Sequence, residues 1–176
     1  MLVEGSPGLH VDIGSSVLTI GVTSAVSRTV FVDYRPLHVT VKGLDSVAAS
    51  ITQLPFPDES VESLSCLHVI EHIGLGRYGD PLDPEGGIKA ARELMRILKP
   101  GGRLYLSLPI GRSRVCFNAH RVQDPEAVRE IFRQLNLISF SCVDDVGNYH
   151  VDVDPSGFGA EEYACGMYFF EKPASR

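Results

Sequence analysis

The sequence predicts an α/β fold, with a mostly parallel, doubly wound sheet between two layers of helices. Residues 9–33 read as a strand, a turn, a helix, a second strand and a final acidic residue, the order of a nucleotide-binding half of such a fold. Residues 61–67 are mostly apolar or small and alternate imperfectly, which is typical of a strand buried on both faces of a parallel sheet. Helical and strand segments then alternate to the end of the chain. At 176 residues the chain suits one domain, residues 1–176.

The composition excludes several classes of protein. The formal net charge is -6 and no basic run stands out, so nucleic acid is not an expected partner. No apolar run is long enough to span a bilayer, and we expect no signal peptide. The 4 cysteines are far apart and form no CxxC pair, which favours reduced thiols and a cytoplasmic location.

The first half of the chain supplies three strands. Residues 9–13, 29–33 and 46–51 read as strands, the last of them at the edge of the sheet. A helical stretch at 17–27 joins the first two strands, and a mixed connector at 37–45 leads to the third. The polar residues that follow these strands are therefore expected at one edge of the sheet.

The second half is organised around the buried strand at 61–67, which ends abruptly in ionisable residues. We expect the remaining elements to be a glycine- and proline-rich loop at 74–84, a helix at 84–98 capped by Asp83, a strand at 103–109, a loop at 110–121, a helix at 124–134 and strands at 137–143 and 163–171. The last two strands are expected to pair antiparallel.

Two segments carry a resemblance to a known family. LPFPDESVESLSCLHVIEHI and ARELMRILKPGGRL, at residues 54–73 and 91–104, resemble class I S-adenosylmethionine-dependent methyltransferases. The resemblance implies a three-layer, Rossmann-like fold whose seven-stranded sheet is mostly parallel, with an antiparallel last strand inserted beside the fifth. These enzymes usually have a helix before the first strand, so a version trimmed at the N-terminus is expected.

A narrower resemblance covers most of the chain between residues 12 and 150. SLSCLHVIEHIGLGRYGDPLDPEGG, LSLPIGRSRVCFNAHRV and VDDVGNYH resemble a bacterial and nematode family of methyltransferase-like proteins of unknown function. The family implies no known substrate. Such proteins often accompany surface-sugar synthesis, which suggests a sugar-related acceptor.

The methyltransferase resemblance implies a cofactor site at the ends of the first four strands. Asp12 and Gly14 match the first motif, whereas Ser16 and Leu18 stand where further glycines are usual. Asp33 follows Gly14 by 19 residues, a spacing that fits a hydrogen bond to the ribose hydroxyls. The expected cofactor-binding residues are Asp12, Gly14, Ser15, Ser16, Asp33, Tyr34, Ser50, Ile51, Leu67 and His68. Ser50 replaces the acid that usually reads adenine. The alternatives are a plain strand-to-helix turn with serine capping, and a solvated Asp33.

The segment from His68 to His72 has the form H-x-x-E-H, an inverted zinc-protease motif. That motif needs a helix that places both histidines on one face. Here it follows a buried strand and precedes Gly74 and Gly76, so we expect no metal. The remaining alternative is a pair of histidines that cap carbonyls at the strand end.

The two long loops are expected to overhang the cofactor site and to hold the acceptor. Their arginines suit an anionic group, because guanidinium pairs with carboxylate or phosphate. We expect His72 and His120 as catalytic bases and Glu71, Arg77, Tyr78, Arg112, Asn118 and Arg121 as acceptor-binding residues. The alternative is a solvated loop paired with the acidic residues Asp144, Asp145, Asp152 and Asp154.

Two functions follow from these observations. The first is methyl transfer from S-adenosylmethionine to a small, anionic acceptor. The second is a degenerate, non-catalytic domain that keeps the fold and serves as a binding or partner module, which the altered glycine motif favours.

Overall fold

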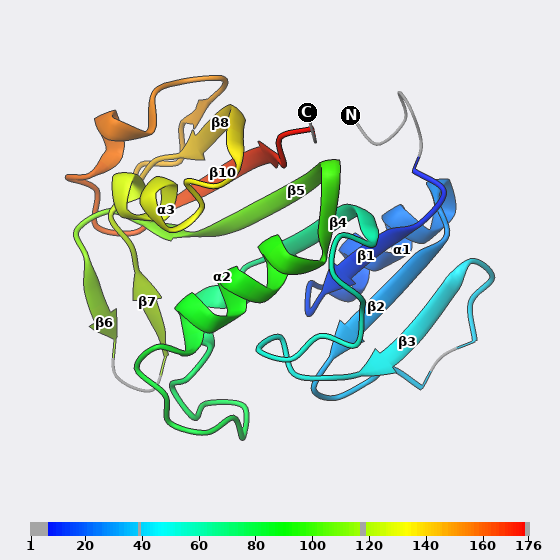
Figure 1. Ribbon diagram of the computed structural model, residues 1–176. Helices are drawn as coiled ribbons and strands as arrows, with labels where there is room; N and C mark the ends of the chain where they lie inside the picture. Colours follow the sequence, from blue (N-terminus) through cyan, green and yellow to red (C-terminus); the bar gives the residue numbers. More distant parts are fainter. Residues whose placement is uncertain (1–6, 39, 117–118, 175–176) are drawn as a thin grey trace.

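The computed structural model describes residues 7–38, 40–116 and 119–174 (Figure 1). In chain order the elements are β1 (His10–Ile13), α1 (Val17–Val26), β2 (Thr29–Asp33), β3 (Leu44–Ala48), β4 (Val61–Leu67), the 3-10 turn η1 (Ile70–His72), α2 (Gly86–Ile97), β5 (Leu98–Ile110), β6 (Arg114–Cys116), β7 (His120–Val122), α3 (Pro125–Ile131), β8 (Asn136–Val143), β9 (Tyr149–His150), the 3-10 turn η2 (Pro155–Phe158) and β10 (Ala164–Glu171).

The main sheet is mostly parallel, as predicted. Its strand order is β3-β2-β1-β4-β5-β10-β8-β9, and the pairs from β3 to β5 are all parallel. The last strand, β10, lies antiparallel between β5 and β8, which confirms its expected insertion beside the fifth strand. The described sheet has 8 strands where seven were expected, because the short strand β9 pairs with the edge of β8.

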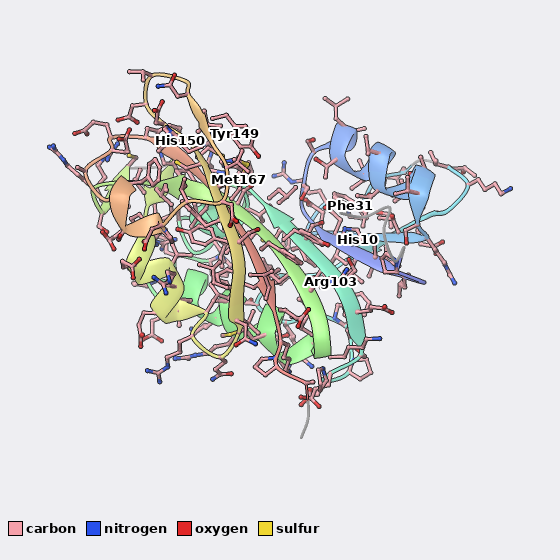
Figure 2. The ribbon with its side chains drawn as sticks, turned by 90° about the horizontal axis from the view of Figure 1, so that it is seen from above. His10, Phe31, Arg103, Tyr149, His150 and Met167 are labelled. Carbon is pink, nitrogen blue, oxygen red and sulfur yellow. The ribbon has the colours of Figure 1, made fainter. Side chains whose placement is uncertain are left out.

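The helices form one layer on each face of the sheet. Figure 2 shows α1 on one side, over β1 and β2, and α2 and α3 on the other side. The apolar spacing of α2 places Ala90, Ala91 and Leu94 against the sheet, and all three are fully buried. They pack with Leu64 and Leu104 of the two central strands, which are equally inaccessible. Since the core fixes β4 and β5 firmly, the segments that leave their carboxyl ends start from rigid positions.

Several element boundaries differ from those that the sequence predicts. The third strand is Leu44–Ala48 rather than 46–51, because residues 50–53 leave the sheet as a turn in which the Gln53 amide donates to the Ser50 carbonyl. The first turn of α2 begins at Gly86, not at Pro84. Asp83 closes the preceding turn instead, where its Oδ1 accepts the Glu85 amide at 3.0 Å.

The second long loop contains regular structure that was not expected. Within residues 110–121, β6 and the start of β7 form an antiparallel hairpin in which Cys116 pairs with His120. The next helix begins where predicted, since Asp124 accepts two amides at its N-terminus, but its helical turns end at Ile131. The strand β7 of this hairpin packs beside η1, where His120 lies next to His72 and Arg121 donates to the Ile73 carbonyl.

Candidate functional site

A pocket of about 350 Å³ opens at the carboxyl ends of β1, β2 and β4 and beside the turn after β3. It is lined by Ile13, Gly14, Val32, Asp33, Tyr34, Arg35, Ala49, Ser50, Ile51, Thr52, His68, Val69, His72, Ile73, Gly74, Tyr78, Asp80, Pro81, Asp83 and Gly86. In open α/β sheets ligands bind in this position, outside the carboxyl ends of the strands. Its volume suits a ligand of small-molecule size.

Six of the ten expected cofactor-binding residues line this pocket. They are Gly14, Asp33, Tyr34, Ser50, Ile51 and His68. Gly14 has a φ of 61°, and a Cβ placed on it would lie 3.2 Å from a methyl group of Val69. The missing side chain therefore keeps the floor of the pocket open at the point where the first strand ends.

The other four residues build the turn beneath the pocket. Asp12 is fully buried, and its carboxylate accepts the Ser15 amide at 3.0 Å and the hydroxyl of Ser65. Ser15 Oγ in turn accepts the Leu67 amide at 3.3 Å, which ties β1 to β4. Ser16 caps α1 by accepting the Thr19 amide. These side-chain hydrogen bonds hold the turn between β1 and α1 in place although it lacks the usual glycines.

Asp33 and Ser50, two of the six expected residues that line the pocket, differ in whether they have a polar atom available to a ligand. Asp33 Oδ1 accepts the Arg35 amide at 2.7 Å, and Oδ2 faces Gly14, at 3.4 Å from an ideal Cβ on that glycine. One carboxylate oxygen therefore points toward the pocket. Ser50 Oγ is held by the Thr52 hydroxyl at 2.8 Å and accepts the Thr52 amide. Its hydroxyl is mainly committed to the turn.

The end of β4 gathers two histidines around one buried carboxylate. His68 Nδ1 lies 3.1 Å from Glu71 Oε1, and His72 Nε2 lies 3.8 Å from the same oxygen. Glu71 is 2% exposed, and its Oε2 has no hydrogen-bond partner among the described residues. His72 Nδ1 donates to the Ala119 carbonyl at 2.6 Å, which leaves Nε2 as the nitrogen able to accept a proton.

The H-x-x-E-H segment does not form the helix that a zinc site would need. Only Ile70–His72 is helical, as a single 3-10 turn, and His68 lies before it with a φ of 57°. Within the described ranges, no group of three His, Cys, Asp or Glu side chains has the arrangement that could hold a metal ion.

Most of the expected acceptor-binding residues meet beside His72. Tyr78 packs edge-on against the His72 ring at 5.4 Å between centroids, and His120 lies 6.3 Å from it on the other side. Arg77 donates to the Ala119 carbonyl at 3.2 Å, and Arg121 donates to the Ile73 carbonyl at 2.6 Å. Burial, followed by the charge of His72, lowers the pKa of His120.

Arg112 stands apart from that group. Arg112 is exposed and pairs with Glu162 at 3.3 Å, and Arg114 approaches the same carboxylate. No described contact joins Arg112 to Glu71 or His72, and Asn118 lies outside the described residues. The acids expected to neutralise the loops are used elsewhere: Asp144 pairs with His150, and Asp145 accepts the Glu162 and Tyr163 amides.

Three residues at this site were not among the site residues expected from the sequence. Asp80 lines the pocket, and its two carboxylate oxygens accept the amides of Gly74 and Tyr78, so it shapes the loop that carries Tyr78. Tyr163 packs against His120 at 5.0 Å between ring centroids. Cys165 Sγ lies 3.3 Å from His68 Nε2. Aspartate in a glycine-rich loop is a turn signal that could have indicated Asp80.

The different positions of the two arginines predict different effects on stability. We expect Arg121→Ala to lower the free energy of unfolding by about 1–2 kcal/mol, because the half-buried Ile73 carbonyl loses its charged donor. Arg112→Ala should change it by less than about 0.5 kcal/mol, because its ion pair is exposed on both sides. Urea denaturation of both variants measures the difference, and equal effects would contradict the assigned contacts.

Comparisons with known proteins agree with this architecture. The sequence matches the family described as "Caenorhabditis protein of unknown function, DUF268" over residues 22–152. The chain belongs to this family. Membership agrees with the expected family of unknown function, whereas its bacterial and nematode distribution stays a prediction. No curated protein matches the chain.

Solved structures with the same fold include methyltransferases and one other enzyme. A Burkholderia thailandensis 1,6-didemethyltoxoflavin-N1-methyltransferase with bound S-adenosylhomocysteine has a TM-score of 0.68 at 14% identity, over 97% of this chain and 73% of that one. The N-methyltransferase NodS of Bradyrhizobium japonicum with S-adenosylhomocysteine has a TM-score of 0.67 at 16% identity, over 98% and 81%. The [4+2]-cyclase SpnF has a TM-score of 0.66 at 14% identity, over 95% and 75%. These likenesses show the class I methyltransferase fold.

None of the helices in the described part of the chain is long and apolar enough to cross a membrane.

Proposed function

We propose that this protein binds S-adenosylmethionine and transfers its methyl group to a small, anionic acceptor. The observation that carries the proposal is the pocket at the carboxyl ends of β1, β2 and β4, where Gly14 leaves space and Asp33 directs a carboxylate oxygen inward. Two neighbours of the same fold bind S-adenosylhomocysteine. When bound, the cofactor supplies an electrophilic methyl group on a sulfonium.

The chain's own residues divide between holding the cofactor and placing the acceptor. Asp33 would hold the ribose hydroxyls, and the turn at Ser50 and Ile51 would lie against the adenine. Tyr34 completes that side of the pocket, while His68 and Val69 close it at the end of β4. Because methyl transfer is an in-line displacement, positioning of the two reactants supplies most of the rate enhancement.

The acceptor would bind on the opposite side of the pocket, around His72. Tyr78 lines the pocket next to His72, and Arg77 stacks over the Tyr78 ring with its guanidinium 5.3 Å from the centroid. Arg77 and Arg121 each use one amino group on a loop carbonyl and retain further donors for an anion. An acceptor oxygen or nitrogen must also lose a proton, which His72 Nε2 can take. His120 is the second candidate base, held at a lowered pKa beside His72.

Calorimetry with S-adenosylmethionine and S-adenosylhomocysteine tests the cofactor assignment directly. We expect saturable binding of both, with one site per chain. Absence of heat with either ligand at millimolar concentration would overturn methyl transfer. It would favour the second function, a non-catalytic module, which the fold also permits because one fold hosts several functions. The SpnF neighbour, described as a cyclase, illustrates that range.

A further inference from the structure

A thiol, an imidazole and a carboxylate lie in line at the carboxyl end of β4. Because β10 runs antiparallel to β5, its first residues lie at the edge where β4 ends, and Cys165 pairs with Pro109 there. Cys165 Sγ is 3.3 Å from His68 Nε2, and His68 Nδ1 is 3.1 Å from Glu71 Oε1. Such an arrangement, in which a third group orients the base beside a nucleophile, is the general form of an activated nucleophile.

The carboxylate in this row is unusual for its burial. Glu71 is 2% exposed, and its second oxygen, Oε2, is buried without a hydrogen-bond partner among the described residues. A buried carboxyl group that is only half satisfied destabilises the fold, so its presence at a strand end requires a reason other than stability. The His68 side chain is 45% exposed and lines the large pocket, whereas Cys165 is half-buried. The row therefore connects a buried carboxyl group to a partly accessible thiol.

The electrostatics of the row favour a proton on the imidazole. Hydrogen bonds to Cys165 and Glu71 raise the pKa of His68 to about 10, against the opposing effect of burial. A protonated imidazole beside a sulfur atom favours the thiolate, which is the nucleophilic form of cysteine. Tyr163 and Cys142 also lie near Cys165, and burial raises the pKa of both, the latter to about 12, so they stay protonated near neutral pH. Glu161, Asp144 and Asp145, whose charges further raise the pKa of Cys142, place negative charge at the same end of β8 and β10.

We propose that Cys165, His68 and Glu71 form a nucleophilic thiol site that attacks an electrophilic carbon. In the resting pair the thiol proton already resides on His68, so the sulfur is a thiolate, and its electron pair forms a new S–C bond. The bond between that carbon and its leaving group breaks, and the leaving group departs with the bonding pair. Glu71 is a positioning residue, which orients the imidazole and stabilises its charge. This activity is separate from methyl transfer to an acceptor and does not require it.

The other cysteines provide controls within the same molecule. Cys66 and Cys142 are fully buried, so neither should react while the protein is folded. Cys116 is half-buried, like Cys165, and no described imidazole or carboxylate bonds its sulfur. If exposure alone decided reactivity, Cys116 and Cys165 would react at similar rates.

Labelling with iodoacetamide, resolved by mass spectrometry of each cysteine, tests the site. At pH 6.5 we expect Cys165 to be alkylated about tenfold faster than Cys116, with the ratio falling toward pH 9 as the ordinary thiol ionises. His68→Asn and Glu71→Gln should each reduce the Cys165 rate toward that of Cys116. The Cys116 rate should not change, and Cys66 and Cys142 should stay unlabelled, which shows that the variants are folded. Cys165→Ser should remove the fast phase.

Equal rates at Cys165 and Cys116 across the pH range would overturn the proposal, as would a rate ratio unchanged by His68→Asn in a folded variant. A second arm identifies the source of the carbon. Methylation of Cys165 after incubation with S-adenosylmethionine would make the cofactor the donor to the site. Alkylation by iodoacetamide without that methylation would assign the site to a separate electrophile. Fast labelling in a protein that gives no heat with S-adenosylmethionine would remove the proposed function and leave the thiol site in place.

Discussion

Asp33→Ala should weaken the binding of S-adenosylmethionine by about 1.5–3 kcal/mol, the range for hydrogen bonds to a charged group. One oxygen of this carboxylate is used by the Arg35 amide at 2.7 Å, and the other faces the pocket beside Gly14. The variant therefore removes the expected ribose ligand. It also removes the carboxylate oxygen that accepts the Arg35 amide and shapes the turn. Calorimetry at constant salt measures the change in Kd.

Asp33→Asn separates the two contributions. Asparagine retains an oxygen that can accept the Arg35 amide, and loses the charge and one acceptor for the ribose. We expect most of the loss of affinity to remain in Asp33→Asn. Asp45→Ala is the matched control, because Asp45 lies on the neighbouring strand β3 and pairs with Arg28 in an exposed ion pair. An unchanged Kd in folded Asp33→Ala would show that Asp33 is not the ribose ligand.

The parts of the fold that the sequence predicts well are those where burial and periodicity coincide. The strand Val61–Leu67 has the predicted bounds, because its burial on both faces produces a run of apolar and small residues that only the exposed Glu62 interrupts. The third strand is misplaced by two residues at its start, since it lies at the sheet edge and is only partly buried. The hairpin of β6 and β7 was missed because its mixed polar sequence has no period that marks a strand.

The residues of the candidate site also divide into those that the sequence could assign and those that it could not. Residues that end parallel strands, such as Gly14, Asp33 and His68, could be assigned to one pocket, because parallel strands end at one edge of the sheet. Cys165 could not be assigned in that way. It begins a strand rather than ending one, and reaches His68 across 97 positions of sequence only because β10 is antiparallel. The pairing of Arg112 with Glu162 likewise depends on where a distant loop lies.

A buried polar network between the side chains of β1 and β4 predicts a marked loss of stability in acid. His10 is fully buried, and its two ring nitrogens each bond a serine hydroxyl, Ser63 and Ser65, at 2.9 Å. Ser65 donates onward to Asp12, so the bonding pattern assigns the His10 proton to Nε2, with Nδ1 accepting from Ser63. A neutral imidazole thus uses both serines, whereas a second proton, on Nδ1, would displace the hydroxyl hydrogen of Ser63 from that nitrogen.

Burial lowers the pKa of His10 from 6.5 to about 4 in the folded protein. The unfolded chain therefore takes up this proton first, and stability is lost as the pH falls from about 6.5 toward 4. For His10 alone the loss between pH 7 and pH 4.5 is about 2–3 kcal/mol. Asp12 acts in the opposite direction, because burial raises its pKa, and the folded state then binds this proton more readily than the unfolded chain.

We therefore expect His10→Gln, which cannot titrate, to be less stable than the unmodified protein at pH 7 but to lose about 2–3 kcal/mol less on acidification to pH 4.5. Asp12→Asn, which removes the opposing carboxylate, should steepen the loss in acid. Urea unfolding at both pH values measures these differences. His38→Gln is the control, because His38 is an exposed histidine in the connection between β2 and β3, outside the buried network. If His10→Gln and the unmodified protein lost stability in parallel, the buried network would not be the source of the acid sensitivity.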